Sequence, residues 1–183
     1  MDSQTAAAGR PLIISYSYAG HTHRVAQAIQ SITGADWCEI HPRQPYPASF
    51  PELLAQVRRE VRTGCRPELL PSGRTPRLYT VVFAGSPNWC GTIAPPLASW
   101  LSRNQLAGKI ILPFYSHCGG VPCDFQRDIR RLCPGADVRE ALGVLDDSAS
   151  DLPALLRQWI SRTGTDISAA PRPDDRMLQG VSL

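Results

Sequence analysis

The sequence lacks the features that mark secreted and membrane-spanning proteins. No apolar run approaches the roughly 20 residues that a membrane-spanning helix needs. Residues 1–9 have neither the basic nor the apolar part of a secretory signal. We therefore expect a cytoplasmic protein with no membrane partner.

Metal-site and disulfide patterns are also missing. The chain has six cysteines but no C-x-x-C pair and no Cys/His spacing of the zinc-site kind. In a reducing compartment these cysteines are expected to be thiols, and no metal site is predicted. The cysteines are Cys38, Cys65, Cys90, Cys118, Cys123 and Cys133.

Charge is moderate and its basic excess is small, which argues against a nucleic-acid partner. Charged residues make up 19% of the 183 residues, and the formal net charge is only +3. The densest basic group, Arg58, Arg59 and Arg62, has helical spacing, so we interpret it as a solvated helix face. Because 43% of the residues are apolar, one domain with a buried core is expected.

Apolar segments of strand type alternate with segments of helical periodicity along the chain. Expected strands cover Leu12–Ser15 and residues 37–40, 78–84, 109–115 and about 137–142. Expected helices cover residues 25–32, 50–61, 93–101, 124–132 and 147–160. This alternation predicts an α/β fold with a doubly wound, mostly parallel sheet, because parallel strands need helical crossovers.

The two ends of the chain lack this periodicity. We expect residues 1–10 to be a flexible N-terminus, residues 11–162 to form the domain, and residues 163–183 to be a flexible tail. No internal repeat is found.

Three loops after expected strands have unusual composition. Ligands of open α/β sheets bind beyond the carboxyl ends of the strands, where these loops lie. The first loop is Ser17, Tyr18, Ala19, Gly20, His21 and Thr22; the second is Ser86, Pro87, Asn88, Trp89, Cys90, Gly91 and Thr92; the third is Ser116, His117, Cys118, Gly119 and Gly120.

The first loop opens a helix and combines hydroxyls with a glycine, a composition that suits a phosphate. An equal alternative is that Ser17 and Thr22 only cap the helix. The loop has neither the Gly-Lys-Ser/Thr ending of a nucleotide-triphosphate loop nor G-x-G-x-x-G, so a single phosphate monoester is favoured. A tyrosine-phosphatase signature at His117-Cys118 fails, because Asp124 stands where its arginine would be.

These loops resemble motifs of the flavodoxin family, most closely its short-chain, flavodoxin-like oxidoreductases. Residues 17–22 resemble Ser-x-Thr-Gly-Asn-Thr, residues 87–91 resemble Pro-x-Trp-Trp-Gly, and residues 116–120 resemble Thr-His-Gly-Gly-Ser. Two linkers agree as well: residues 40–47 resemble Glu-x-Pro followed by Pro-Tyr-Pro, and residues 132–136 resemble Leu-x-Pro-Gly-Ala. The resemblance runs from about residue 12 to residue 144.

The resemblance implies a flavodoxin-like five-stranded parallel sheet of order 2-1-3-4-5 with helices on both faces. It also implies a site for flavin mononucleotide (FMN), with the first loop around the phosphate and the other two beside the ring. Trp89 offers a face for stacking on that ring, or is a core tryptophan. Backbone N–H groups of Cys118, Gly119 and Gly120 are expected to reach the pyrimidine carbonyls. His117 either contacts the flavin or is structural.

Several positions depart from the family pattern. Ala19 removes a hydroxyl from the phosphate loop, His21 replaces an asparagine, and Cys90 stands where a second tryptophan is common. Gly120 and Val121 depart in the third loop. These changes concern the substrate face more than the flavin site.

The function expected from the resemblance is an FMN-dependent oxidoreductase that passes electrons or hydride from a donor such as NAD(P)H to a small, quinone-like acceptor. Tyr18, His117 and Cys118 are the polar candidates to tune the ring, and no residue is assigned as nucleophile or base. The alternatives are a one-electron carrier that docks on redox proteins, typically a strongly acidic protein, and a flavin-free binding module. A homodimer is compatible with the sequence.

Overall fold

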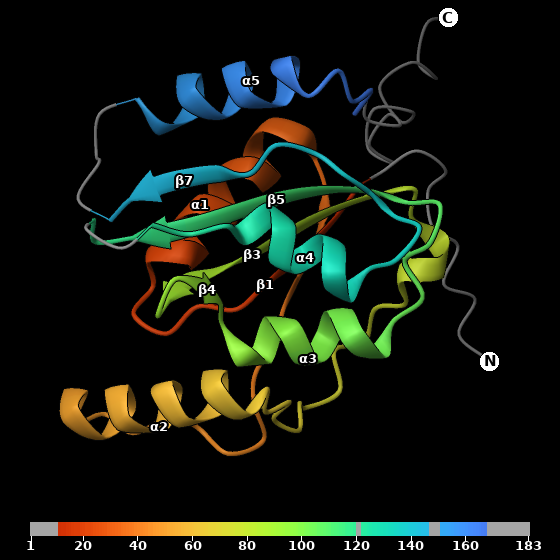
Figure 1. Cartoon of the computed structure of the whole chain (residues 1–183). Helices are drawn as coiled ribbons and strands as arrows, with labels where there is room; N and C mark the ends of the chain where they lie inside the picture. The colour runs from red at the N-terminus through yellow and green to blue at the C-terminus, as the bar shows by residue number, and fades with distance from the viewer. Residues whose placement is uncertain (1–10, 120–121, 147–150, 168–183) are drawn as a thin grey trace, which may run out of the picture.

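A central parallel β-sheet carries the fold of the computed structural model, which describes residues 11–119, 122–146 and 151–167 (Figure 1). The main strands run in the order β2-β1-β3-β5-β6, and β7 also pairs with β5. They are β1 (Leu12–Ser15), β2 (Asp36–Glu39), β3 (Val81–Trp89), β5 (Ile110–His117), β6 (Asp137–Val138) and β7 (Leu142–Leu145). Apart from the hairpin strand β4 (Thr92–Ile93), this is the predicted order 2-1-3-4-5, which confirms the predicted fold.

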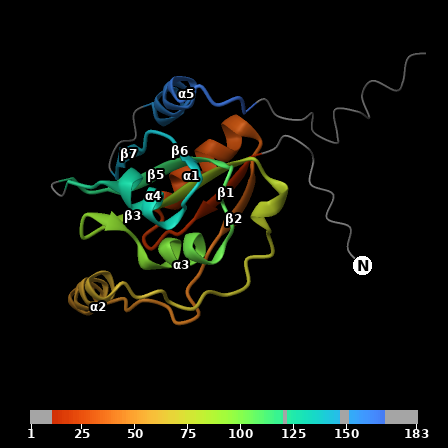
Figure 2. The same cartoon turned by 45° about the vertical axis from the view of Figure 1, so that its right-hand side comes forward.

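Helices cover both faces of the sheet (Figures 1 and 2). One face carries α1 (His21–Thr33) and α5 (Leu152–Arg162), whose buried residues share one hydrophobic cluster. The other face carries α2 (Phe50–Thr63), α3 (Pro95–Arg103) and α4 (Phe125–Leu132), which share the second cluster. Two cores on opposite sides of one sheet arise because the crossovers are right-handed and the strand order reverses its direction after β2.

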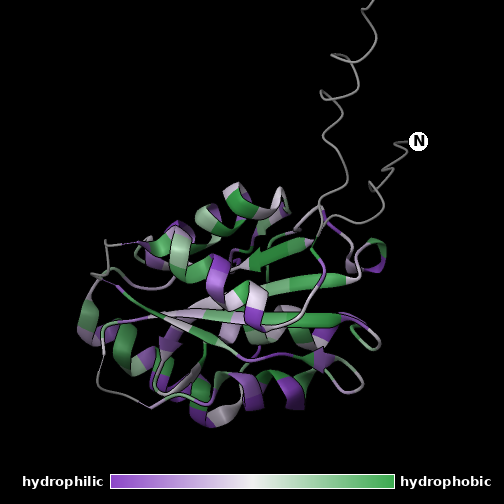
Figure 3. Cartoon of the chain, turned by 90° about the horizontal axis from the view of Figure 1, so that it is seen from above, coloured by the Kyte–Doolittle hydropathy of each residue, from purple (hydrophilic) through white to green (hydrophobic). Residues whose placement is uncertain are grey.

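The central strands contribute side chains to both cores. In β1, Leu12 and Ile14 lie in the cluster under α2 and α3, whereas Ile13 lies in the cluster under α1 and α5. A strand buried on both faces shows a continuous apolar sequence rather than alternation. The strands therefore stand out as the hydrophobic centre of the molecule between more polar helices (Figure 3).

Helix ends follow the local signals in the sequence. Asp124 accepts a hydrogen bond from the backbone N–H of Arg127 and so caps α4, close to the predicted start of that helix. Gly64 follows α2 with φ of 66°, a left-handed conformation that glycine adopts without strain. The last helix begins at Leu152, later than the predicted residue 147; residues 147–150 lie outside the described part of the chain.

The single strand expected at residues 137–142 is corrected to two short strands, β6 and β7. Both pair with β5, and the gap between them lies opposite Leu112 and Pro113. Odd-numbered residues of this segment turn their backbone groups toward β6 and β7. The carbonyls of residues 109, 111 and 117 accept hydrogen bonds from the N–H groups of residues 137, 139 and 146, respectively. By the same alternation Pro113 faces this side and has no N–H to donate, so the ladder is interrupted there.

The first residues of the expected tail belong to the packed domain. Thr163 and Thr165 are buried, and Ile167 packs against the cluster under α1 and α5. The domain thus extends to residue 167, and the prediction for the remaining tail, like that for residues 1–10, lies outside the described residues.

Strand β3 is longer than expected and forms a hairpin with β4 that has a two-residue loop. Asn88 pairs with Ile93 and Trp89 with Thr92, which leaves Cys90 and Gly91 at the turn with φ of 55° and 82°. Two central residues with positive φ define the hairpin turn in which Asn-Gly is preferred. Cys90 adopts a backbone conformation that disfavours ordinary side chains.

We predict that Gly85→Ala strongly destabilises the fold. A Cβ at this position of β3 would overlap the ring of Phe114 on the neighbouring strand. The expected loss is about 1–3 kcal/mol of unfolding free energy or more, measured by urea denaturation. Adding Phe114→Leu should recover part of the loss made by Gly85→Ala, and strictly additive effects of the two substitutions would contradict the overlap.

We also predict that Cys90→Asn stabilises the protein by about 1 kcal/mol, because asparagine tolerates the left-handed conformation better than cysteine. Thermal unfolding followed by circular dichroism measures the gain. Cys118→Asn is the matched control, since Cys118 is an exposed cysteine without positive φ. An equal change in both variants, or a lower melting temperature for Cys90→Asn, would refute the turn assignment.

Candidate functional site

The three predicted loops meet at the edge of the sheet where the parallel strands end. Thr22, at the start of α1, shares a buried hydrogen bond of 2.9 Å with Ser116 at the end of β5. Pro87 pairs in register with the same Ser116, and the rings of Tyr18 and Trp89 lie 5.9 Å apart. Residues far apart in sequence therefore surround one region, which we call the site edge.

The start of α1 offers backbone N–H groups to an anion. The first four N–H groups of a helix have no intrahelical acceptor. Ser17 Oγ accepts two of them, from Gly20 and His23, each at 3.2 Å. Those of His21 and Thr22 remain at the positive end of the helix dipole, which favours a phosphate. The capping and phosphate interpretations of this loop are thus compatible.

The first loop leaves open space above Gly20. This glycine has φ of 88°, and nothing lies within 4 Å of where a Cβ would stand. Ala19 and Tyr18 are both exposed, and the Tyr18 hydroxyl donates to the carbonyl of Pro47 at 2.6 Å. The Thr22 hydroxyl, by contrast, points into the protein toward Ser116, so only the backbone of Thr22 faces the site edge.

The second loop is the β3–β4 hairpin, and its far side is anchored to α4. Thr92 Oγ1 donates to the Asp128 carboxylate at 2.6 Å. The buried Ser86 hydroxyl accepts from the N–H of Ala94 at the start of α3. Pro87, Asn88 and Trp89 belong to strand β3, and Cys90 and Gly91 form the turn between β3 and β4.

Trp89 lies within an aromatic cluster that consists of Tyr16, Tyr18, Tyr46 and Trp89. The Trp89 ring meets Tyr46, Tyr16 and Tyr18 edge-on, with centroids 4.9, 5.4 and 5.9 Å away. The indole is half-buried and packs against the hydrophobic cluster under α2 and α3. Trp89 therefore contributes to the core and also lies at the site edge. Edge-to-face contacts of this kind fix the orientation of a ring.

The third loop places an imidazole beside the end of β5. His117 Nδ1 accepts a hydrogen bond of 3.1 Å from the backbone N–H of Gly119, so the ring proton is on Nε2. The Gly119 N–H is thus directed to His117 in this structure, and its contact with a pyrimidine carbonyl stays a prediction. Cys118 is exposed and Gly119 has φ of 92°. Gly120 and Val121 lie outside the described residues.

Two charged side chains that the sequence did not single out join the site edge. Asp146 follows β7, its N–H donates to the carbonyl of His117, and its carboxylate lies 3.9 Å from His21 Nδ1. Arg24 Nη2 donates to the carbonyl of Asp146 at 2.8 Å. The position of Asp146 after a strand was a usable signal, although the interrupted strand obscured it.

The cysteines differ in accessibility. Burial raises the pKa of Cys123 to about 11 and that of Cys133 to about 12, so both remain protonated at neutral pH. Burial also raises the pKa of Cys38. Cys90 and Cys118 are the two exposed cysteines of the six, and both belong to the predicted loops.

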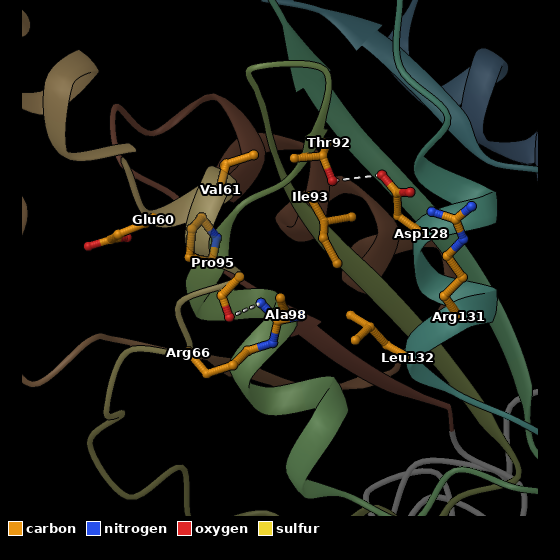
Figure 4. A pocket seen from close by; sticks show the side chains of 11 residues that line it. Glu60, Val61, Arg66, Thr92, Ile93, Pro95, Ala98, Asp128, Arg131 and Leu132 are labelled. Atoms are coloured by element: carbon orange, nitrogen blue, oxygen red, sulfur yellow. Dashed lines mark hydrogen bonds between the residues drawn. The ribbon is translucent and has the colours of Figure 1, made fainter. Parts of the chain in front are cut away.

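A separate cavity of about 210 Å³ lies between α2, α3 and α4 (Figure 4). Ile93, Ala98 and Leu132 line its apolar part, and Arg66 turns its guanidinium back to the carbonyl of Gly64. Among the described residues of the three loops, only Thr92 lines this cavity. Within residues 11–119, 122–146 and 151–167, no cluster of His, Cys, Asp and Glu is arranged to hold a metal ion. The helices in these ranges are too short or too polar to cross a bilayer.

Comparisons with solved structures agree with the fold. The chain is similar to a protein assigned as a flavoprotein from Bacteroides eggerthii, with a TM-score of 0.74, 21% identity, and coverage of 86% of this chain and 99% of that one. It is also similar to a flavoprotein in complex with FMN from Lactobacillus acidophilus, with a TM-score of 0.66, 19% identity, and coverage of 84% and 99%. No curated protein matches the chain significantly.

The sequence profile of the flavodoxin family matches residues 10–163. This range contains all three loops and every described strand and helix of the sheet layers. The match confirms the resemblance seen in the loop motifs. The protein is therefore a member of the flavodoxin family.

Proposed function

We propose that the protein binds FMN non-covalently at the site edge and serves as an oxidoreductase for small molecules. The proposal rests on three features that meet at the site edge. They are the start of α1, whose N–H groups suit an anion, the half-buried Trp89 indole, and the His117 imidazole, which carries its proton on Nε2. Family membership and a structural neighbour in complex with FMN support the cofactor.

The residues present fit FMN better than a dinucleotide. The N–H groups of His21 and Thr22 at the start of α1 suit one terminal phosphate, and Gly20 leaves the approach open. His21 adds a cation when it is protonated, beside Asp146. The loop has no glycine pattern for a second phosphate group, so FAD is not expected to bind as well.

The bound flavin supplies the hydride or electron transfer, and the protein orients it and adjusts its surroundings. Trp89 is the proposed contact of the ring, and its edge contacts with Tyr16 and Tyr46 fix its orientation. His117 can donate a hydrogen bond from Nε2 to a ring oxygen, because Gly119 already occupies Nδ1. A fixed donor near the pyrimidine ring stabilises negative charge that develops there.

The charge of the chain favours a small-molecule substrate over a protein partner. The formal net charge is +3, whereas the carriers that the family resemblance suggests are typically acidic. Tyr18, Cys90 and Cys118 are exposed around the site edge, so a small donor or acceptor has access. NAD(P)H and a quinone-like compound are the proposed donor and acceptor.

Anaerobic titration of the FMN-loaded protein tests this function. NADH or NADPH should bleach the visible absorption of the bound flavin, and a quinone should restore it over many cycles. His117→Gln should slow the turnover, because glutamine has no counterpart of Nδ1 to accept from the Gly119 N–H, so its amide donor is not held in place. His41→Gln is the matched control, because His41 lies on none of the three loops. If electrons passed rapidly to a haem protein but not to small acceptors, the carrier alternative would replace this proposal.

A further inference from the structure

Tyr46 connects the aromatic cluster to a buried carboxylate. Its hydroxyl donates to Glu60 Oε2 at 2.6 Å, and its ring lies 4.9 Å from that of Trp89. The other Glu60 oxygen, Oε1, accepts from Gln56 Nε2 at 2.8 Å. Both oxygens of Glu60 therefore accept a hydrogen bond from a neighbouring side chain, the pattern that suits a carboxylate.

This carboxylate is unusual because it is buried without a cationic partner. Glu60 is only 8% exposed and Tyr46 only 9%. No ion pair joins Glu60 to a cation in the described part of the chain, although Arg66 and Arg131 line the same cavity wall. In Figure 4 the carboxylate of Glu60 points away from the other labelled side chains. A buried charge of this kind is costly, so its pairing with a phenol calls for a function.

The other tyrosines with comparable features lack one half of this arrangement. Tyr18 contacts Trp89, but its hydroxyl donates to a backbone carbonyl, which cannot take up a proton. Tyr79 donates to the Asp36 carboxylate at 2.8 Å, but among the described residues no ring contact joins it to a tryptophan. Among the described residues, Tyr46 alone combines a ring contact with an indole and a hydrogen bond to a carboxylate.

We propose that Trp89, Tyr46 and Glu60 form a proton-coupled relay that removes oxidising equivalents from the site edge. A hydroxyl radical at the site edge takes one electron from the Trp89 indole, becomes hydroxide, and leaves an indole radical cation. Tyr46 then gives one electron to the indole while its O–H bond breaks and the proton forms an O–H bond on Glu60. The products are an intact Trp89, a neutral Tyr46 radical and a neutral Glu60 acid.

Glu60 makes this step favourable. Burial raises the pKa of Tyr46 above its ordinary value, and the hydrogen bond to Glu60 raises it further, so the resting phenol keeps its proton. Loss of an electron makes the phenol a strong acid, and in a buried place the proton needs an acceptor already in contact. The carboxylate at 2.6 Å provides that acceptor without any movement of the chain.

The biological use of the relay rests on the proposed function, because a reduced flavin that reacts with oxygen releases hydrogen peroxide, whose one-electron reduction yields the hydroxyl radical. The electron transfer itself needs only the chain. It can therefore be tested on the full-length protein without flavin, while FMN binding is measured separately on the same preparation. A missing relay and a missing flavin site are thus distinguishable.

Pulse radiolysis with azidyl radicals, which oxidise tryptophan, tests the relay. The unaltered chain should show rapid formation of a tyrosyl radical as the indole radical decays. Trp89→Phe and Tyr46→Phe should abolish this fast phase, and Glu60→Gln should slow it strongly, since the amide keeps an acceptor oxygen but takes no proton at neutral pH. Tyr18→Phe and Tyr79→Phe are matched controls and should retain it.

A solvent comparison needs no variant. The fast phase should be slower in D₂O than in H₂O, because a proton moves together with the electron. Equal rates in both solvents would overturn the proposal, even if Glu60→Gln failed to fold. Persistence of the fast phase in Tyr46→Phe, checked for folding by circular dichroism, would overturn it as well.

Discussion

The buried hydrogen bond between Thr22 and Ser116 holds together the part of the structure on which the site depends. It joins the first turn of α1 to the end of β5 across an intervening strand, at 2.9 Å and away from solvent. A hydrogen bond in such surroundings is costly to leave unmade, so the two segments are fixed relative to each other. The N–H groups of α1, the β3–β4 hairpin and the third loop then have defined relative positions.

The register of the sheet makes this convergence possible. Parallel strands all end at the same edge, so Ser15, Gly85 and Phe114 lie side by side in three neighbouring strands. Gly85 leaves room for the Phe114 ring, which fills the core under α1 and α5. The loops that follow these positions therefore emerge close together. Packing within the sheet thus determines where the site lies.

Much of this arrangement could be predicted from the sequence because the signals are local. The apolar run of β1, the helical pattern of α2 ending at Gly64, and Asp124 at the start of α4 are each contained in a few neighbouring residues. Loop composition likewise identified the residues that the structure brings to one edge.

The remaining features depend on contacts between distant segments. The interruption between β6 and β7 arises from Pro113 on another strand, and the β3–β4 hairpin lacks the usual Asn-Gly signal. Tyr46 and Glu60 lie 14 positions apart, and nothing in their local sequence indicates that they share a proton-transfer contact. Asp146 is also brought to His21 only by the folded sheet. Such pairs become visible only in three dimensions.

The aromatic cluster joins the site edge to the interior of the protein. Backbone donors at α1 and the imidazole of His117 suit the binding of an anionic, flat cofactor, whereas the aromatic cluster leads from that edge to the buried Glu60. Trp89 belongs to both, since it contacts Tyr18 on the exposed side and Tyr46 on the buried side. Its orientation links the cofactor site to the interior.

The central claim is that the first turn of α1 binds the phosphate of FMN. Calorimetric titration of the flavin-free protein with FMN and with riboflavin, which lacks the phosphate, tests it most directly. Charge-assisted hydrogen bonds and the helix dipole predict that FMN binds roughly 100-fold more tightly than riboflavin. Equal affinities for the two flavins would contradict the claim.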